Sequence, residues 1–312
     1  MISRALGLAL GVLADQIVGD PRRHHPVAWF GSFAARAEGP LYDDTVAAGA
    51  VYTTATVAPV VALGVAAERL TRRHPVLHTA ATALATWAVL GARSLTREGD
   101  TMADSLEIGD LARARAQLPN LCGRDAAQLD APELARATVE SMAENTADSA
   151  VASLFWGALL GVPGLLGHRA VNTLDAMVGR RDERYGRFGT ASAKLDDALD
   201  LLPARLTGVL GAALAPAVGG SARRAWAITL RDAGNHPSPN GGWCEAAWAG
   251  ALGVQLGGRN VYASRVEERG RLGDGPRPGA CEVRKAAQLV TLVTGAATAL
   301  AAGVALAKRG RR

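Results

Sequence analysis

Five long stretches without a charged residue constrain the fold of this chain more than any other sequence feature. They cover Val46–Ala67, Val76–Ala92, Ser149–Gly167, Leu206–Ala222 and Ala286–Ala307. The first and the last reach 22 residues, enough at about 1.5 Å per residue to cross ~30 Å of hydrocarbon, and the other three are marginal. A soluble domain seldom needs five helices that are apolar on every face. We therefore expect an all-α, polytopic membrane helical bundle, with amphipathic and loop segments forming a polar site at the membrane surface.

Composition agrees with a membrane protein and excludes several other classes. Hydrophobic residues make up 49% of the chain and charged residues only 20%. The net charge of +5 does not indicate nucleic-acid binding, because basic residues gather at 69–73 and 308–312, next to apolar runs, where they mark cytoplasmic ends. The three cysteines are widely spaced, which predicts neither a disulfide framework nor a zinc site. Asp15 and Asp20 follow the short apolar stretch Leu6–Leu13, so a removable signal peptide is not expected.

The chain shows no internal repeat and no long linker, so we expect one domain over residues 1–312. Four polar sections separate the apolar runs. They cover residues 15–44, 93–148, 168–205 and 223–285. These sections must carry the chemistry of the protein.

The stretch VESMAENTADS, residues 139–149, brings carboxylates to the start of an apolar run. Asp130 begins a D-x-x-E capping box, which predicts a helix start. From there Arg136, Glu140 and Glu144 recur every fourth residue, with Asp148 one turn further if the helix continues. The stripe is either a solvated face or a site that holds a cation or a substrate donor, because like charges one turn apart are otherwise destabilising.

A second charged section, residues 168–206, mixes aspartates with arginines and a lysine. Aspartate oxygens can hold Mg²⁺, and arginine or lysine can hold phosphate oxygens. Asp196, Asp197 and Asp200 form a DDxxD pattern, which on its own is also typical of membrane prenyltransferases. That alternative would require a second aspartate-rich motif of similar spacing.

Two loops place histidine beside proline. They read HPSPNGG, from His236, and DPRRHHPVAWF, from Asp20. Prolines and glycines make such segments rigid turns, so His25, His236 and Asn240 are candidate binding or catalytic residues. No GxxxxGK[ST] phosphate loop, dinucleotide GxGxxG motif or GxSxG elbow is present.

Together these motifs resemble adenosylcobinamide-phosphate synthases, the CobD/CbiB family of cobalamin biosynthesis proteins. The matching segments include VESMAENTADS, LFWGALLGVPG, RAVNTLDAMVG, SAKLDDALDLLPARL and HPSPNGGWCEAAWAGALGVQLGG. They extend from about Asp15 to Gly258. At position 194 lysine replaces the family's usual arginine, which keeps the charge but loses the bidentate fork.

The resemblance implies an amide-forming ligase of cobalamin biosynthesis. It would join adenosylcobyric acid to (R)-1-amino-2-propanol or its O-2-phosphate, using ATP and Mg²⁺ because amide formation from a carboxylate is uphill. The expected location is the cell membrane, with a multi-pass chain and an active site on the cytoplasmic side. Membrane lipid and other membrane proteins of the pathway are the further partners that the resemblance admits.

The reaction suggests roles for the charged and polar residues. The attacking amine must lose a proton, for which Glu144, His25 and His236 are alternatives. The substrate and phosphate contacts are assigned to Arg169, Asn172, Lys194, Arg205 and Asn240. The metal ligands are assigned to Glu140, Glu144, Asp148, Asp175, Asp196 and Asp197.

Membrane topology raises a difficulty for a single site. If all five runs span the membrane, the polar sections between them alternate between its two sides. Residues 93–148 and 223–285 then lie on the opposite side from residues 168–205. We therefore expect one or two short runs, Val76–Ala92 or Leu206–Ala222, to be re-entrant or buried.

A non-enzymatic membrane sensor distantly related to the family is a further alternative. A sensor has no evident need to retain NTLDAMVG, LDDALDLLPARL and HPSPNGG together. Their joint presence therefore favours the enzyme.

Overall fold

The computed structural model describes residues 1–21, 25–180, 182–262 and 265–307. It divides into two compact units that are each discontinuous in sequence: unit 1 comprises Met1–Gly91, Asp148–Asp200 and Ala297–Arg312, and unit 2 comprises Ala92–Ala147 and Leu201–Ala296. The basic tail at 308–312 lies outside the described residues. The expectation of one domain stays a prediction.

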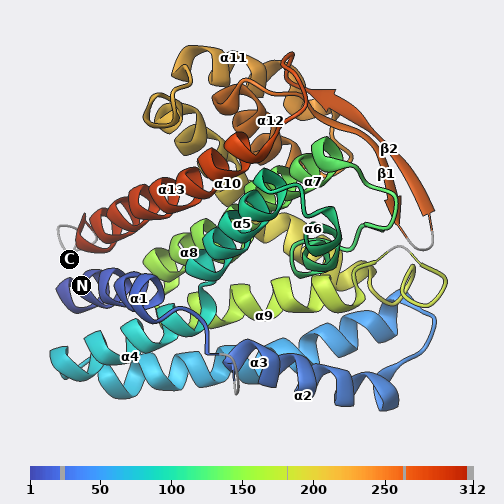
Figure 1. Ribbon diagram of the computed structural model, residues 1–312. Coiled ribbons are helices and arrows are strands. Elements are labelled where there is room, and N and C mark those ends of the chain that lie inside the picture. Colours follow the sequence, from blue (N-terminus) through green and yellow to red (C-terminus); the bar gives the residue numbers. More distant parts are fainter. Residues whose placement is uncertain (22–24, 181, 263–264, 308–312) are drawn as a thin grey trace. The chain divides into compact units, whose positions relative to one another are not determined.

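The elements of the two units are nearly all helical (Figure 1). Unit 1 contains α1 (Ile2–Val18), α2 (Pro26–Leu41), α3 (Val46–Thr71), α4 (Pro75–Val89), α8 (Ala152–Leu160) and α9 (Val162–Val178). Unit 2 contains α5 (Ala92–Glu107), α6 (Leu111–Gln117), α7 (Ala131–Thr146), α11 (Ala222–Asp232), α12 (Gly241–Leu252), β1 (Leu256–Tyr262) and β2 (Arg265–Leu272). The boundary between the units falls within α10 (Thr190–Leu214) and α13 (Ala280–Ala307).

Four helical segments are long and apolar enough to cross a membrane: Val46–Thr71, Pro75–Glu107, Thr190–Val218 and Ala280–Ala307. The all-α membrane bundle expected from the sequence is therefore confirmed. The small antiparallel hairpin of β1 and β2 is an addition to the all-α expectation, which assigned no strand.

The apolar run Ser149–Gly167 does not form one long helix. A π-helical turn covers Ala147–Val151, and the chain then breaks at Gly161 between α8 and α9. Gly161 has a φ of 78°, a conformation that favours glycine, and a Cβ there would collide with the side chains of Arg4 and Glu68. The other two short runs are interrupted as well, since α4 ends at Val89 within Val76–Ala92 and α10 ends at Leu214 within Leu206–Ala222. That one or both of these runs are re-entrant or buried stays a prediction.

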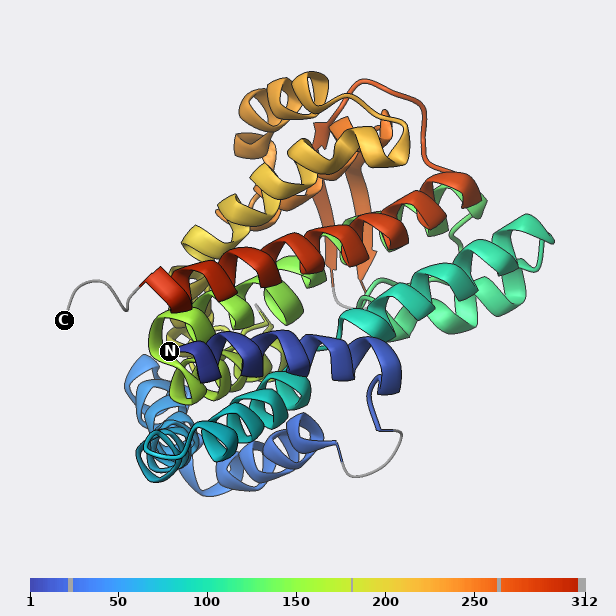
Figure 2. The same cartoon turned by 90° about the vertical axis from the view of Figure 1, so that its left-hand side faces the viewer.

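In unit 1, α1 lies along α4 and α3 lies along α9 (Figures 1 and 2). Gly7 and Gly11 bring α1 close to α4, since a Cβ at either position would overlap Thr82 or Thr86. This is the small-xxx-small spacing that lets membrane helices approach closely.

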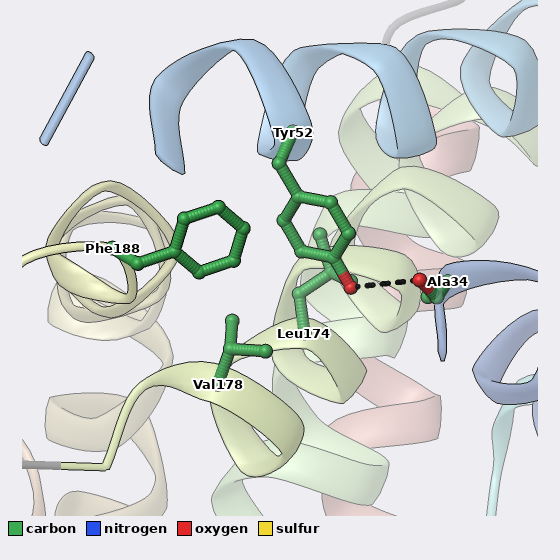
Figure 3. Close-up of a cluster of buried hydrophobic side chains, with 5 residues drawn as sticks. All are labelled: Ala34, Tyr52, Leu174, Val178 and Phe188. Carbon is green, nitrogen blue, oxygen red and sulfur yellow. Dashed lines mark hydrogen bonds between the residues drawn. The ribbon is translucent and has the colours of Figure 1, made fainter. Parts of the chain in front are cut away.

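The core of unit 1 at α2, α3 and α9 is shown in Figure 3. Its buried residues are Ala34, Tyr52, Leu174, Val178 and Phe188. The Tyr52 hydroxyl donates to the carbonyl oxygen of Ala34 at 3.2 Å, which satisfies the one polar group of this cluster.

In unit 2, α7 packs against α5, α12 and β1. The predicted helix start is confirmed with Asp130 as its N-cap, because the Asp130 carboxylate accepts from the backbone N–H of Glu133 at 3.0 Å. The Glu133 carboxylate pairs with Arg136 and Arg277 instead of completing a capping box. The helix is buried on most of its surface. Its polar side chains must therefore find partners inside the protein.

Candidate functional site

A polar site in unit 2 is centred on Glu144 near the end of α7. His236, just before α12, places its Nε2 3.8 Å from Glu144 Oε1 and 3.3 Å from Glu245 Oε1. Glu245 comes from the middle of α12. The side chains of His236 and Glu245 are 1% and 0% exposed, whereas that of Glu144 is 34% exposed. Glu144 is therefore the member of this triad that a ligand can reach.

The HPSPNGG loop fits closely against this carboxylate. The backbone N–H of Ser238 donates to His236 Nδ1 at 3.0 Å, and the Ser238 hydroxyl accepts from the N–H of Gly241 at 3.1 Å. A Cβ on Gly241 would lie 2.5 Å from Glu144 Oε1. A side chain at this position would displace the Glu144 carboxylate and crowd the His236 ring.

Arg269 on β2 also reaches the triad. Its Nη1 lies 2.9 Å from His236 Nε2, 3.4 Å from Glu245 Oε1 and 4.0 Å from Glu144 Oε1. Its Nη2 donates to the Tyr262 hydroxyl at 3.2 Å. The guanidinium therefore lies where three potential cation ligands converge.

Burial and charge shift the titration of this site. Burial, with the charges of Glu140 and Glu144, raises the pKa of Glu245 to about 7, against the opposing effect of His236. Burial alone would lower the pKa of His236, but the hydrogen bond and charge of Glu245 and the charge of Glu144 raise it overall. Burial also lowers the pKa of Arg269, yet Glu144 and Glu245 outweigh it and the net shift is upward.

These shifts predict a pH dependence of stability. A group whose folded-state pKa is raised contributes stability that is present below its unfolded pKa and is lost as pH rises through its folded pKa. For Glu245 this window runs from 4.5 to about 7, and His236 acts in the same direction. We expect the unfolding free energy to fall between pH 5 and 8 more steeply in the wild type than in Glu245→Gln, measured by SDS titration in mixed micelles. Equal slopes would contradict the assignment.

Glu140, one turn before Glu144, has a different environment. Its carboxylate forms an ion pair with Arg124, accepts from Arg136 Nη1 at 3.1 Å and accepts from the N–H of Gly257 at 2.7 Å. Burial raises its pKa, but Arg124 and Arg136 outweigh this effect and lower it overall. Of the two alternatives for this stripe, the solvated face does not hold at Glu140 and Arg136, since their side chains are each 1% exposed.

The predicted site residues divide between the units. Unit 2 holds Glu140, Glu144, Arg205, His236 and Asn240, and unit 1 holds His25, Asp148, Arg169, Asn172, Asp175, Lys194, Asp196 and Asp197. In unit 2, Arg205 Nη1 donates to Asn240 Oδ1 at 3.0 Å, as expected for residues of one binding surface. The roles assigned to all of these residues stay predictions.

Arg169 in unit 1 is influenced by several carboxylates. Arg169 Nη1 lies 3.3 Å from Asn172 Oδ1, and the charges of Asp148, Asp20 and Asp196 act on it. Burial and then the charges of Asp197 and Asp200 raise the pKa of Asp175 to about 6.

Two other unit 1 residues bear on the sequence predictions. His25 caps α2, with Nδ1 accepting from the N–H of Val27 at 3.1 Å and Nε2 3.3 Å from Asp20. Lys194 is exposed.

The buried pair of Asp200 and His168 bears on the DDxxD pattern. Asp200 Oδ1 lies 2.8 Å from His168 Nε2, and His168 Nδ1 lies 3.3 Å from the Ser153 hydroxyl. The third carboxylate of DDxxD is therefore engaged inside unit 1. This disfavours the diphosphate site of a prenyltransferase.

Two sets of residues bear on the expected Mg²⁺. Within the described ranges, only Glu144, His236 and Glu245 bring three potential ligand atoms within 4.8 Å of one another. This set does not fit Mg²⁺, which prefers oxygen ligands, while Arg269 already contacts the same atoms. In unit 1 the buried Asp196 Oδ1 has no hydrogen-bond partner among described residues, and the charges of Asp200, Asp175 and Asp197 act on Asp196. The oxygen donors of this second set are the kind that Mg²⁺ prefers, but no three of their described ligand atoms lie within 4.8 Å of one another.

Contacts in unit 2 also constrain membrane topology. Glu144 and His236 lie in one site, and Arg284 Nη2 lies 2.7 Å from both Asp104 Oδ1 and Glu107 Oε2. A bilayer cannot separate residues in contact. The candidate span Thr190–Val218 lies between Glu144 and His236 in sequence. Either this segment does not cross the membrane, or a second segment between the two residues crosses back.

This topology predicts the outcome of cysteine labelling. Cys281 is exposed at the start of α13, whereas Cys122 is half-buried and Cys244 is buried. With a membrane-impermeant maleimide, we expect Cys281 in the wild type and a cysteine introduced by Asp104→Cys in a Cys281→Ser background to label from the same side. Labelling from opposite sides would refute the shared location.

The fold and site define a helical membrane protein with a largely buried polar site. Within its triad, the Glu144 carboxylate is the group that ligands can reach. The chain belongs to the CobD/Cbib protein family, whose model matches residues 8–290. It therefore spans both units.

Curated relatives agree with this membership. The chain is 51% identical over 300 residues to "Cobalamin biosynthesis protein CobD" of Mycobacterium tuberculosis (strain ATCC 25618 / H37Rv), covering 96% of this chain and 95% of that protein. Proteins of the same name from Geobacter metallireducens and Rhodobacter capsulatus are 44% and 40% identical, covering 86% and 92% of this chain and 86% and 95% of theirs. No solved structure matches the chain.

The site contains residues that the sequence patterns did not single out. They are Glu245, Arg269, Arg124 and Tyr262. Glu245 stands alone among apolar residues in GGWCEAAWAGAL, and a lone ionisable residue in such a segment is a recognisable indication of function. Arg269 and Arg124 are distant from α7 and α12 in sequence, and no local spacing connects them.

Proposed function

We propose that the chain acts in cobalamin biosynthesis as an ATP-dependent amide-forming enzyme. It joins the propionate carboxylate of adenosylcobyric acid to the amine of (R)-1-amino-2-propanol or its O-2-phosphate. Family membership supports the pathway. The observation that carries the reaction class is the accessible Glu144 carboxylate with the buried His236 and Glu245 behind it.

The reaction needs an activated acid and a neutral amine. A carboxylate oxygen of the corrinoid attacks the terminal phosphorus of ATP and ADP leaves. The amine nitrogen then attacks the acyl carbon, and the acyl C–O bond breaks as phosphate departs with the former carboxylate oxygen. The nitrogen gives up a proton in forming the amide.

Glu144 is the proposed acceptor of that proton. It is the exposed member of the triad, so it can contact the incoming amine, and a general base within hydrogen-bond reach typically contributes about 10²–10⁴-fold to the rate. His236 and Glu245 are positioning residues that act through Glu144. When protonated, His236 attracts the Glu144 carboxylate from 3.8 Å, and Glu245 orients the His236 ring from 3.3 Å.

Magnesium and phosphate contacts are assigned to the remaining predicted residues. Asp175, Asp196 and Asp197, together with Asp148 just before α8, would hold Mg²⁺. When bound, the ion would offset the negative charge of the phosphate oxygens. Arg169, Asn172 and Lys194 in unit 1, and Arg205 with Asn240 in unit 2, would contact the substrates. We further propose the cell membrane as the location, with the site on the cytoplasmic side where ATP is available.

Reconstitution tests this function. The full chain in liposomes is supplied with adenosylcobyric acid, aminopropanol or its phosphate, ATP and Mg²⁺, and the corrinoid product is followed by mass. We expect an increase in mass corresponding to one amide bond, and none when ATP is omitted. Absence of product with folded protein and every substrate present would contradict the proposal.

A further inference from the structure

Two arginines beside the unit 2 triad, Arg124 and Arg269, carry buried N–H groups that have no hydrogen-bond partner among the described residues. Arg124 is only 8% exposed. Its Nη2 contacts Glu140, but its Nη1 is buried and has no hydrogen-bond partner among the described residues. Arg269 Nε is also buried and has no hydrogen-bond partner among the described residues. Glu267 Oε2 lies at an ion-pair distance of 3.6 Å from it. Buried donors of this kind usually have a partner, and a ligand can supply it.

The positive charge of Arg124 acts on Arg269 and opposes its charged form. Tyr262 connects them. Its backbone bridges to Arg124, and its hydroxyl accepts from Arg269 Nη2 at 3.2 Å. A doubly charged anion between the two arginines would relieve the repulsion and accept the unused N–H groups.

An unused acceptor lies on the carboxylate side of the same site. Glu245 Oε2 is buried and has no hydrogen-bond partner among the described residues, and Glu245 and Arg124 interact electrostatically. Carboxylates thus lie next to the donors, and Glu144 is the one that a ligand amine can reach.

We propose that Arg124 and Arg269, with the Tyr262 hydroxyl, form a phosphate-binding subsite beside Glu144 and Glu245. The subsite is distinct from the contacts assigned above to Arg169, Lys194 and Arg205. Its role in catalysis rests on the proposed function. The phosphate has two possible sources with the same chemistry: the O-phosphate of the amine substrate, or the inorganic phosphate that leaves the acyl group.

Direct binding tests the subsite without any turnover. Inorganic phosphate is titrated into the detergent-solubilised full chain and followed by ³¹P NMR. We expect binding that Arg269→Gln and Arg124→Gln each weaken at least about tenfold, the scale of losing one charge-assisted hydrogen bond. Arg231→Gln is the matched control, because Arg231 pairs with Asp232 and Asp274 in the same unit.

Folding is controlled with two milder variants. Arg124→Lys keeps the charge and the ion pair with Glu140, and Tyr262→Phe removes only a hydroxyl. Both should fold like the wild type and weaken phosphate binding by a smaller factor than Arg124→Gln. If folded Arg269→Gln and Arg124→Lys bind phosphate as tightly as the wild type and Arg231→Gln, the subsite is refuted.

Kinetic measurements distinguish the two sources. If the anion is the substrate's own phosphate, Arg269→Gln raises KM for aminopropanol phosphate by a larger factor than KM for free aminopropanol. If it is the leaving phosphate, the variant instead loses product inhibition by inorganic phosphate. Phosphate binding without any amide product would sustain the subsite and overturn the proposed function, so the two failures are distinguishable.

Discussion

Replacing Glu144 with glutamine is expected to lower kcat for amide formation by about 10²–10⁴-fold, because a glutamine amide cannot accept the proton of the amine. The glutamine keeps the size of the side chain, and position 144 is partly exposed. The unfolding free energy should therefore stay close to that of the wild type. The measurement is the single-turnover rate of amide formation with saturating substrates.

The control for this variant is Glu268→Gln. Glu268 lies in unit 2, and its side chain is 72% exposed, so its charge should not matter for turnover. If Glu144→Gln retains more than about a tenth of the wild-type rate, Glu144 is not the acceptor of the proton that the amine loses. His25, the remaining alternative outside the triad, would then be the residue to vary.

Replacing Glu140, one helical turn before Glu144, with glutamine should mainly lower stability, whereas Glu144→Gln should mainly lower the rate. The unfolding free energy is expected to fall by about 3–5 kcal/mol, because Arg124 and Arg136 would be left buried without their shared counter-charge. Their side chains are 6% and 1% exposed, so water cannot replace the carboxylate. The measurement is SDS titration in mixed micelles, with the wild type and Glu144→Gln in parallel.

The reason for this contrast is that the two glutamates differ in what surrounds them and not in their position along the helix. A loss of stability below about 1 kcal/mol in Glu140→Gln would mean that the buried ion pairs do not stabilise α7. Equal effects of the two variants on stability would contradict the division of roles along this helix.

Much of the helical framework could be predicted from local sequence. Uncharged runs identified the spanning candidates, and the capping box at Asp130 located the start of α7. The break at Gly161 could not be predicted in the same way. It depends on a tertiary contact in which the Glu68 carboxylate accepts from the N–H of Val162 at 3.0 Å.

The site could be predicted only in part. Helical spacing placed Glu140 and Glu144 on one face, but it could not show that Arg124 neutralises one of them and that the other faces His236. Those differences come from residues far apart in the chain, which meet only when α7, α12 and the hairpin pack together. Arg269 is the clearest case, because β2 itself was not recognised.

The transfer of oxygen from the corrinoid carboxylate to phosphate tests the proposed chemistry most directly. Adenosylcobyric acid labelled with ¹⁸O in the reacting carboxylate is supplied with ATP, Mg²⁺ and the amine to the full chain in liposomes, and the released phosphate is analysed by mass. An acyl phosphate route predicts one ¹⁸O atom in inorganic phosphate for each amide formed. Amide formation with no ¹⁸O in the phosphate would contradict this account.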